Sequence, residues 1–215
     1  MTHGLLSTTT LASLAAMAAP ITHSSHRTVL WAVRIALVVA LGITVSFPGW
    51  EQFEGKGMAL RVPLYLLPAF VVPIVWRMRG KQHPYPSPVD ALVVAPFLAD
   101  TLGNVLGFYS RFDATDDVLH FVNWVLLMGG ITLGLLRTKV NNLTAWVLGW
   151  GLGALAIIWW EAAEWLVQEL GTNGLQLTYG DTIGDLIASS TGGAVGSALA
   201  IRFTRNRASN ILTTG

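Results

Sequence analysis

The chain has 215 residues and a formal net charge of +1, with 53% hydrophobic residues, 12% charged residues and a mean hydropathy of +0.55. Soluble domains carry about 25% charged residues, so this composition excludes a soluble globular protein and predicts an integral membrane protein. The small net charge and the short basic clusters argue against nucleic-acid binding, and a chain without cysteine has no disulfide or thiolate chemistry.

The N-terminal segment, residues 1–27, is rich in threonine and serine and lacks the basic leading region of a secretory signal. We expect this segment to be a weakly ordered or interfacial lead-in. An additional membrane span over residues 5–21 is the alternative, although its hydroxyl side chains lower the hydropathy.

Six later windows have the length and apolarity of a membrane-spanning helix, which needs about 20 residues. They cover residues 28–47, 58–76, 89–109, 117–136, 143–170 and 181–203, and connectors rich in Gly, Pro and Asn separate them. The sequence therefore predicts an all-α, polytopic helix bundle with six transmembrane helices in a single domain over residues 28–203. A basic tail over residues 204–215 follows it.

The orientation follows from the basic residues in short loops, which favour the cytoplasmic side. Such residues follow the second, fourth and sixth spans, at Arg77, Arg79, Lys81, Arg137, Lys139, Arg202, Arg205 and Arg207. Both termini are therefore predicted to be cytoplasmic, and the loops after the first, third and fifth spans are predicted to face outward. Apart from Arg34, which we interpret as a snorkelling side chain, the cytoplasmic halves of the spans look almost free of polar groups.

The outer halves of five spans instead carry polar residues at one common depth, estimated from a helical rise of about 1.5 Å per residue. These residues are Arg61, Asp100, Asn104, His120, Glu161, Glu164 and Asp185. Asp100 and Asn104 lie one turn apart and either line a pocket floor or make an interhelical hydrogen bond. Trp159, Trp160 and Trp165 are expected to form an interfacial aromatic belt.

Acidic and histidine side chains are also spaced three or four residues apart, which places each pair on one helix face. The pairs are Asp116 or Asp117 with His120, Glu161 with Glu164, and Asp181 with Asp185. An aspartate facing lipid costs about 2.5–3.5 kcal/mol even on the lenient insertion scale. We therefore expect an acidic pocket that opens to the outer face, with Arg61 or Arg111 as the countercharge.

Three motifs carry a family resemblance: DDVLH, EAAEW and GDTIGDLIASSTGGAVG. Over residues 110–200 the chain resembles the YjdF-like family of small bacterial inner-membrane proteins and, more distantly, the VanZ-like family. Asp185, Gly192 and Gly196 fit the VanZ-like pattern, whereas Ser189 and Glu164 depart from it. The resemblance implies a multi-pass protein of the bacterial cytoplasmic membrane with a site at these motifs, and it implies no reaction.

Structural interpretations compete with each candidate. Asp117 or Asp181 fits a helix N-cap, and Glu161 and Glu164 fit a structural pair neutralised by Arg61 or by protonation. The glycines near Gly192 indicate close helix packing. Asp185, deeper in its span, is harder to explain as a cap.

Three functions are consistent with this pattern. The first is an enzyme acting on a lipid-linked or envelope substrate at the outer leaflet, with Glu161, Glu164 and His120 as catalytic residues and Arg61, Asp100, Arg111 and Asp181 as binding residues. A divalent metal, Mg²⁺, Mn²⁺ or Zn²⁺, would be held by Asp117, His120, Glu161, Glu164 and Asp185. The second is proton- or cation-coupled transport. The third is a noncatalytic subunit that binds a partner membrane protein or membrane lipid.

Overall fold

The protein is an all-helical bundle in a computed structural model, which describes residues 23–171 and 177–213. Its elements are α2 (His23–Ser46), η1 (Glu51–Phe53), α3 (Met58–Leu66), α4 (Pro68–Met78), α5 (Ser87–Val105), α6 (Phe108–Arg111), α7 (Thr115–Leu136), α8 (Asn142–Glu169) and α9 (Tyr179–Thr213). Six segments are long and apolar enough to cross a membrane, with α3 and α4 sharing one of them. The predicted fold class is therefore confirmed. Residues 1–22, including the alternative span 5–21, lie outside the described residues.

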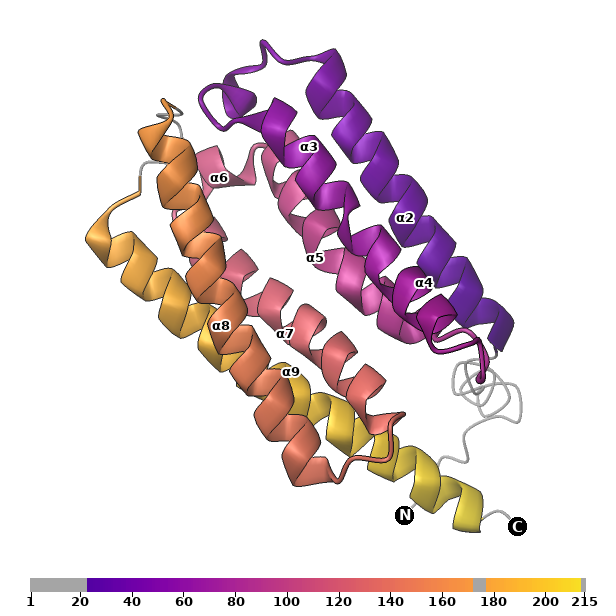
Figure 1. The fold of residues 1–215 in the computed structure, drawn as a ribbon. Coiled ribbons are helices and arrows are strands. Elements are labelled where there is room, and N and C mark those ends of the chain that lie inside the picture. The colour runs from indigo at the N-terminus through magenta and orange to yellow at the C-terminus, as the bar shows by residue number, and fades with distance from the viewer. Residues whose placement is uncertain (1–22, 172–176, 214–215) are drawn as a thin grey trace, which may run out of the picture.

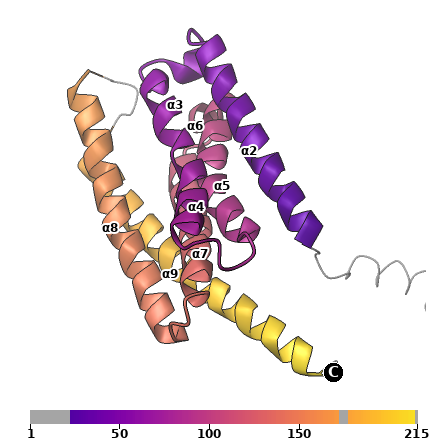
Figure 2. The same ribbon diagram turned by 45° about the vertical axis from the view of Figure 1, so that its right-hand side comes forward.

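The helices form two groups, one of α2 to α5 and one of α7 to α9, joined by the packing of α5 against α7 (Figures 1 and 2). Within the second group α9 packs along α7, and α8 packs against both. The connections α2–α3, α5–α7 and α8–α9 lie at one end of the bundle in Figure 1, whereas α2 begins and α9 ends at the other end. This alternation agrees with the loop pattern predicted for six spans.

Element boundaries differ from the predicted windows where proline or glycine intervenes. The second span is broken at Leu67, because Pro68 has no N–H to continue the hydrogen-bond ladder of α3. The third span ends at Val105, since Gly107 has a φ of 67° and starts the short helix α6. The predicted tail from residue 204 begins within α9, which continues to Thr213.

Small residues bring α7 and α9 into backbone contact. A Cβ built at Gly192 would meet the backbone of Phe121, and one built at Gly196 would lie 2.8 Å from Cα of Val125. Thr132 donates a hydrogen bond of 2.9 Å to Ser197 across the same contact. This close approach holds the polar residues at the outer ends of α7 and α9 together.

The expectation that Arg34 snorkels is wrong, because its guanidinium lies 2.7 Å from the carboxylate of Asp90, which is fully buried in the first turn of α5. The same guanidinium nitrogen donates a 2.6 Å hydrogen bond to the carbonyl of Ala69. That carbonyl has no helical donor four residues later, since Pro73 lacks an N–H. The prediction of nearly apolar cytoplasmic halves is wrong for the same reason.

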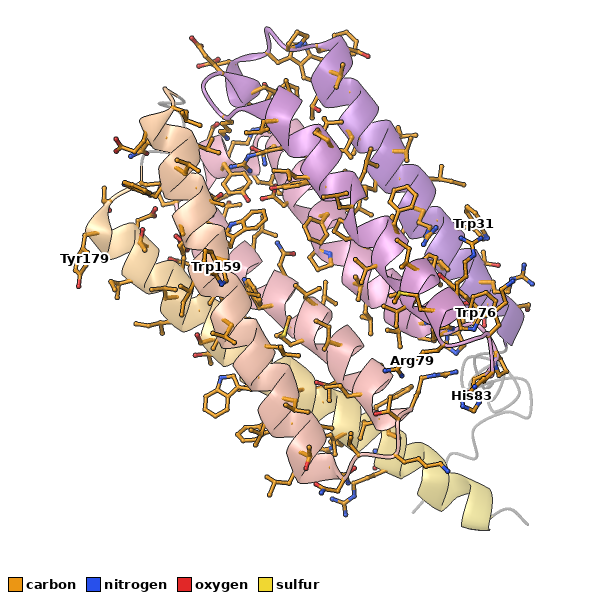
Figure 3. All side chains as sticks on the ribbon, in the orientation of Figure 1. Trp31, Trp76, Arg79, His83, Trp159 and Tyr179 are labelled. Carbon is orange, nitrogen blue, oxygen red and sulfur yellow. The ribbon has the colours of Figure 1, made fainter. Side chains whose placement is uncertain are left out.

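A third side chain completes this cluster, because the hydroxyl of Tyr85 also donates to Asp90. Burial and this hydrogen bond raise the pKa of Tyr85 well above its ordinary value. Trp76, whose indole N–H donates to the carbonyl of His83 at 2.8 Å, lies near the same end of the molecule, with Arg79 and His83 beside it (Figure 3).

Candidate functional site

A cavity of about 310 Å³ lies between the two helix groups at the predicted outer end. Three of its lining residues come from the predicted outer connections: Lys56 before α3, Tyr109 in α6 and Leu177 before α9. The others come from α3, α5, α7 and α8 and are Arg61, Tyr65, Pro96, Phe97, Asp100, Asn104, Asp116, Leu119, His120, Asn123, Trp124, Leu127, Ala156, Trp160 and Glu164. Of the seven polar residues that the sequence placed at one depth, five line this pocket: Arg61, Asp100, Asn104, His120 and Glu164. Glu161 and Asp185 are absent from its lining.

Asp100 of α5 is the centre of a hydrogen-bond network on one side of the pocket. Tyr65 donates to its Oδ2 at 2.7 Å, and Tyr109 donates to its Oδ1. Asn104 donates at 3.0 Å to the backbone carbonyl of Asp100 and accepts a 3.1 Å hydrogen bond from the Lys56 ammonium. Both carboxylate oxygens of Asp100 are thus satisfied, which suits a positioning role better than metal binding.

Arg61 links this network to α8 on the opposite wall. Its Nη1 lies 3.5 Å from Oδ2 of Asp100, and its Nη2 lies 3.3 Å from Oε1 of Glu164. Beside this bridge, the rings of Tyr65 and Trp160 have centroids 6.0 Å apart. Of the two countercharges predicted for the acidic pocket, the structure therefore places Arg61 inside it.

His120 of α7 connects the carboxylates of α7 and α9. Its Nδ1 lies 3.0 Å from the hydroxyl of Ser189, and its Nε2 lies 3.6 Å from both Oδ1 of Asp116 and Oδ1 of Asp185. Asp185 and Ser189 are both buried. With one nitrogen held by a hydroxyl, the other nitrogen faces two carboxylates and is oriented for a cation.

Glu161 is buried on the face of α8 that packs against α7 and α9, together with Gly153 and Ile157. It is 6% exposed, and neither of its carboxylate oxygens has a hydrogen-bond partner among the described residues. A buried carboxylate without partners is costly, so this one requires a proton or a cation.

Two overlapping groups of side chains have the geometry to hold a metal ion. Asp116, His120 and Asp185 form one, and His120, Glu161 and Glu164 form the other; in each, the ligand atoms lie within 4.8 Å of one another. Carboxylate oxygens with one imidazole suit Mg²⁺, Mn²⁺ or Zn²⁺. The residues present thus fit a divalent cation, and the partnerless oxygens of Glu161 give it a ligand.

Three predicted site residues belong neither to these groups nor to the pocket lining: Asp117, Asp181 and Arg111. The structure places Asp116 beside His120, whereas Oδ1 of Asp117 lies against α9 at Gly184, 3.4 Å from a Cβ built there. Asp181 is half-buried near the start of α9 and is absent from the pocket lining. Arg111 is exposed at the end of α6 and is also absent from that lining.

The aspartates that were considered as helix N-caps do not cap their helices in the structure. Ala114 is the N-cap of α7 and no side chain caps that helix, so Asp116 and Asp117 occupy its first turn instead. At α9, the backbone N–H of Asp181 donates to the hydroxyl of Thr178 at 3.1 Å, which makes Thr178 the capping side chain. Side-chain capping therefore explains none of Asp116, Asp117 and Asp181.

Three lining residues were not predicted from the sequence, Lys56, Tyr65 and Tyr109, and Trp160 was predicted to belong to an aromatic belt. Lys56 lies 4.8 Å above the ring of Tyr109, and burial together with the charge of Arg61 lowers its pKa. Burial and the neighbouring Asp100 raise the pKa of Tyr109 well above its ordinary value. Lys56 lies in a connection and Tyr109 was the last residue of the predicted third span, and neither position indicated the pocket, so only the fold brings them into it.

Fold and site together define a multi-pass membrane protein with a polar pocket at one end of its bundle. The chain belongs to the family described as predicted membrane protein (DUF2238), which matches residues 26–206. This is the YjdF-like family that the motifs indicated, whereas the likeness to VanZ-like proteins stays a prediction. No curated protein and no solved structure matches the chain.

Proposed function

We propose that the protein is a metal-dependent enzyme of the bacterial cytoplasmic membrane that acts on a lipid-linked or envelope substrate at the outer face. His120, Glu161 and Glu164 hold the cation, with Asp116 and Asp185 completing its surroundings. The observation that carries this proposal is Glu161, which is buried beside His120 and Glu164 with both oxygens unpartnered among the described residues.

The charge balance supports a cation over a purely structural cluster. Four carboxylates, those of Asp116, Glu161, Glu164 and Asp185, surround His120, and Arg61 reaches only Glu164 among them. Like charges at this spacing in a poorly solvated site repel one another strongly. A divalent ion removes this repulsion and supplies the partner that Glu161 lacks.

The residues of the chain divide into ligands and positioning groups. Ser189 fixes the His120 ring, and a proton on Nδ1 leaves the Nε2 lone pair directed at the carboxylates. Arg61 and Lys56, on the opposite wall, can stabilise negative charge that develops on a substrate. When bound, a divalent ion supplies Lewis-acid polarisation and an acidified water.

The first test is the metal content of the detergent-purified protein, measured by elemental mass spectrometry. We expect a stoichiometric ion in the wild type and in Glu169→Gln, whose carboxyl is exposed on the same helix. Glu161→Gln keeps the side-chain shape and should lose the ion. A wild type that has never met a chelator, holds no metal and takes up none of Mg²⁺, Mn²⁺ or Zn²⁺ would refute the proposal.

Proton- or cation-coupled transport is the second candidate, and Asp90 favours it. This buried carboxylate, whose Oδ1 has no hydrogen-bond partner among the described residues, lies at the predicted cytoplasmic end of α5. Buried ionisable groups at both ends of a bundle are typical of relays. Flux into vesicles that is unchanged by Glu161→Gln and Glu164→Gln would count against it.

A further inference from the structure

We infer that the ligand of the pocket is a membrane amphiphile, which enters sideways from the bilayer between α3 and α8 and lays a hydrocarbon chain in the inner half of the pocket. The inference rests on the proposed function and selects, between a lipid-linked and a water-soluble envelope substrate, the lipid-linked class. It is carried by the distribution of polar and apolar side chains along the cavity.

The cavity changes character with depth. The charged residues of its lining, such as Asp116 and Glu164, lie at the outer end, whereas the inner lining consists of Pro96, Phe97, Trp124, Leu127, Ala156 and Trp160. Leu127 lies eleven residues beyond Asp116 along α7, roughly 16 Å at the rise of a helix. Ala156 lies eight residues before Glu164 on α8, roughly 12 Å in the same direction.

The inner half suits hydrocarbon better than water. A buried water needs two to four polar partners, and the inner lining residues offer at most the indole N–H groups of Trp124 and Trp160. Ala156, Trp160 and Glu164 follow one another at four-residue spacing and therefore form one stripe on α8. This stripe runs from an apolar end to a charged end, as the long axis of an amphiphile does.

Asn123 marks the junction between the two halves. Its side chain lines the cavity, and its Oδ1 is buried without a hydrogen-bond partner among the described residues. An unmatched buried acceptor is unfavourable and selects for a donor on the ligand. The ligand therefore carries a hydroxyl or N–H group where its head joins its chain.

The seam between α3 and α8 provides the entrance. Within the described part of the chain, α8 packs chiefly against α7 and α9, and α3 against α2 and α4. Contacts across the seam include the Arg61–Glu164 ion pair and the Tyr65–Trp160 ring pair. Figures 1 and 2 show α8 standing apart from α3 and α4.

Apolar side chains border the seam on both helices. Leu60 and Leu64, next to Arg61 and Tyr65 on α3, are 49% and 48% exposed, and Trp159, next to Trp160 on α8, is 74% exposed. Side chains of this kind in a membrane-spanning helix face lipid. A hydrocarbon chain thus reaches the cavity from the bilayer without crossing water.

The test is photocrosslinking of the full chain in phosphatidylcholine nanodiscs with a monoacylglycerol that carries a diazirine near the end of its chain. The probe has hydroxyl donors near its chain, as Asn123 requires. We expect labelled peptides at Phe97 and Leu127. Ala156→Phe should fill the inner half and lower that labelling several-fold, whereas Ala162→Phe, exposed on α8 away from the stripe of Ala156, Trp160 and Glu164, should leave it unchanged.

Two further variants separate failure of this inference from failure of the metal proposal and from misfolding. Glu161→Gln should lose metal and keep chain labelling, so labelling in a chain without metal separates failure of the metal proposal from failure of this one. Leu127→Trp is a second blocking variant for use if Ala156→Phe does not fold, and it should lower labelling at Phe97. Labelling confined to lipid-facing residues such as Leu155, or unchanged in the folded blocking variants, would overturn the inference.

Discussion

Replacing Gly192 with alanine places a methyl group against the backbone of α7. A Cβ at this position would lie 3.1 Å from the carbonyl carbon of Phe121 and 3.3 Å from its Cα, and it would be nearer still to the carbonyl oxygen. Ordinary contact begins at 3.4 Å, so the carbonyl carbon alone requires α7 and α9 to separate by about 0.3 Å, and the nearer oxygen requires more. Overpacking of this kind costs about 1–3 kcal/mol, and backbone atoms cannot rotate away as side chains do.

The same displacement reaches the candidate metal site, because His120 directly precedes Phe121 and faces Asp185 and Ser189 on α9. Metal–ligand distances tolerate deviations of about 0.2 Å, less than the separation that Gly192→Ala imposes. We expect the variant to bind metal about 10–100-fold more weakly, the range seen when groups that orient metal ligands are changed.

The assay is unfolding of the detergent-solubilised protein by heat or by titration with sodium dodecyl sulfate, followed by metal titration of the folded fraction. Gly151→Ala is the matched control, since a Cβ there has no atom within 4 Å. The control should be neutral or more stable by up to about 1 kcal/mol, the helix-propensity gain of alanine over glycine. Equal stability of the Gly192 and Gly151 variants would refute the packing argument, whatever the metal titration shows.

Three other predictions test particular contacts by the same unfolding assay. Asp90→Ala should cost about 3–5 kcal/mol because it leaves the Arg34 guanidinium without its ionic partner. The double variant Arg34→Met, Asp90→Leu should recover part of this loss, and a double variant as unstable as Asp90→Ala would contradict the ion-pair argument. Tyr109→Phe removes one donor to the Asp100 carboxylate and should cost about 1.5–3 kcal/mol, so an unchanged unfolding midpoint would argue against that hydrogen bond. The pKa of Lys56 is lower in the folded protein than its ordinary value of 10.5. Between these two pKa values the unfolded chain holds more protons than the folded one, so the free energy of unfolding rises with pH. Lys56→Met should flatten this rise, and an unaltered slope would exclude Lys56 as its source.

The spans and the general position of the site could be predicted because their signals are local. Hydropathy is a sum over a window, and an ionisable residue within a span is unusual wherever its partners lie. Glu161 and Glu164 are examples: their position inside an apolar segment already indicated an interior pocket. The structure brings them together with His120, although their chemical role stays a proposal.

The wrong predictions concern which side chains face one another across neighbouring helices, and residue spacing along one helix does not decide this. Asp116 and Asp117 stand four and three residues before His120, and either spacing places a carboxylate on its face of α7. Only the approach of α9 separates them, because Asp117 faces Gly184 and Asp116 stays beside the imidazole.

Asp90 shows the same limit at the other end of the bundle. It stands at the start of a predicted span, where an aspartate carries no local signal of its role, and its partner Arg34 lies 56 positions earlier in the chain. Pairings over such separations depend on how α2 and α5 pack, which no local pattern records.

The hydrogen bond that Arg34 donates to the carbonyl of Ala69 has a consequence for sequence variation within this family. Proline at position 73 leaves this carbonyl without its helical N–H donor, and the guanidinium of Arg34, on another helix, donates to it instead. A sequence with an ordinary residue at position 73 regains the helical N–H and has less need of a long donor at position 34. The two positions are therefore expected to change together among relatives, and an alignment of the family would reveal this as a covarying pair.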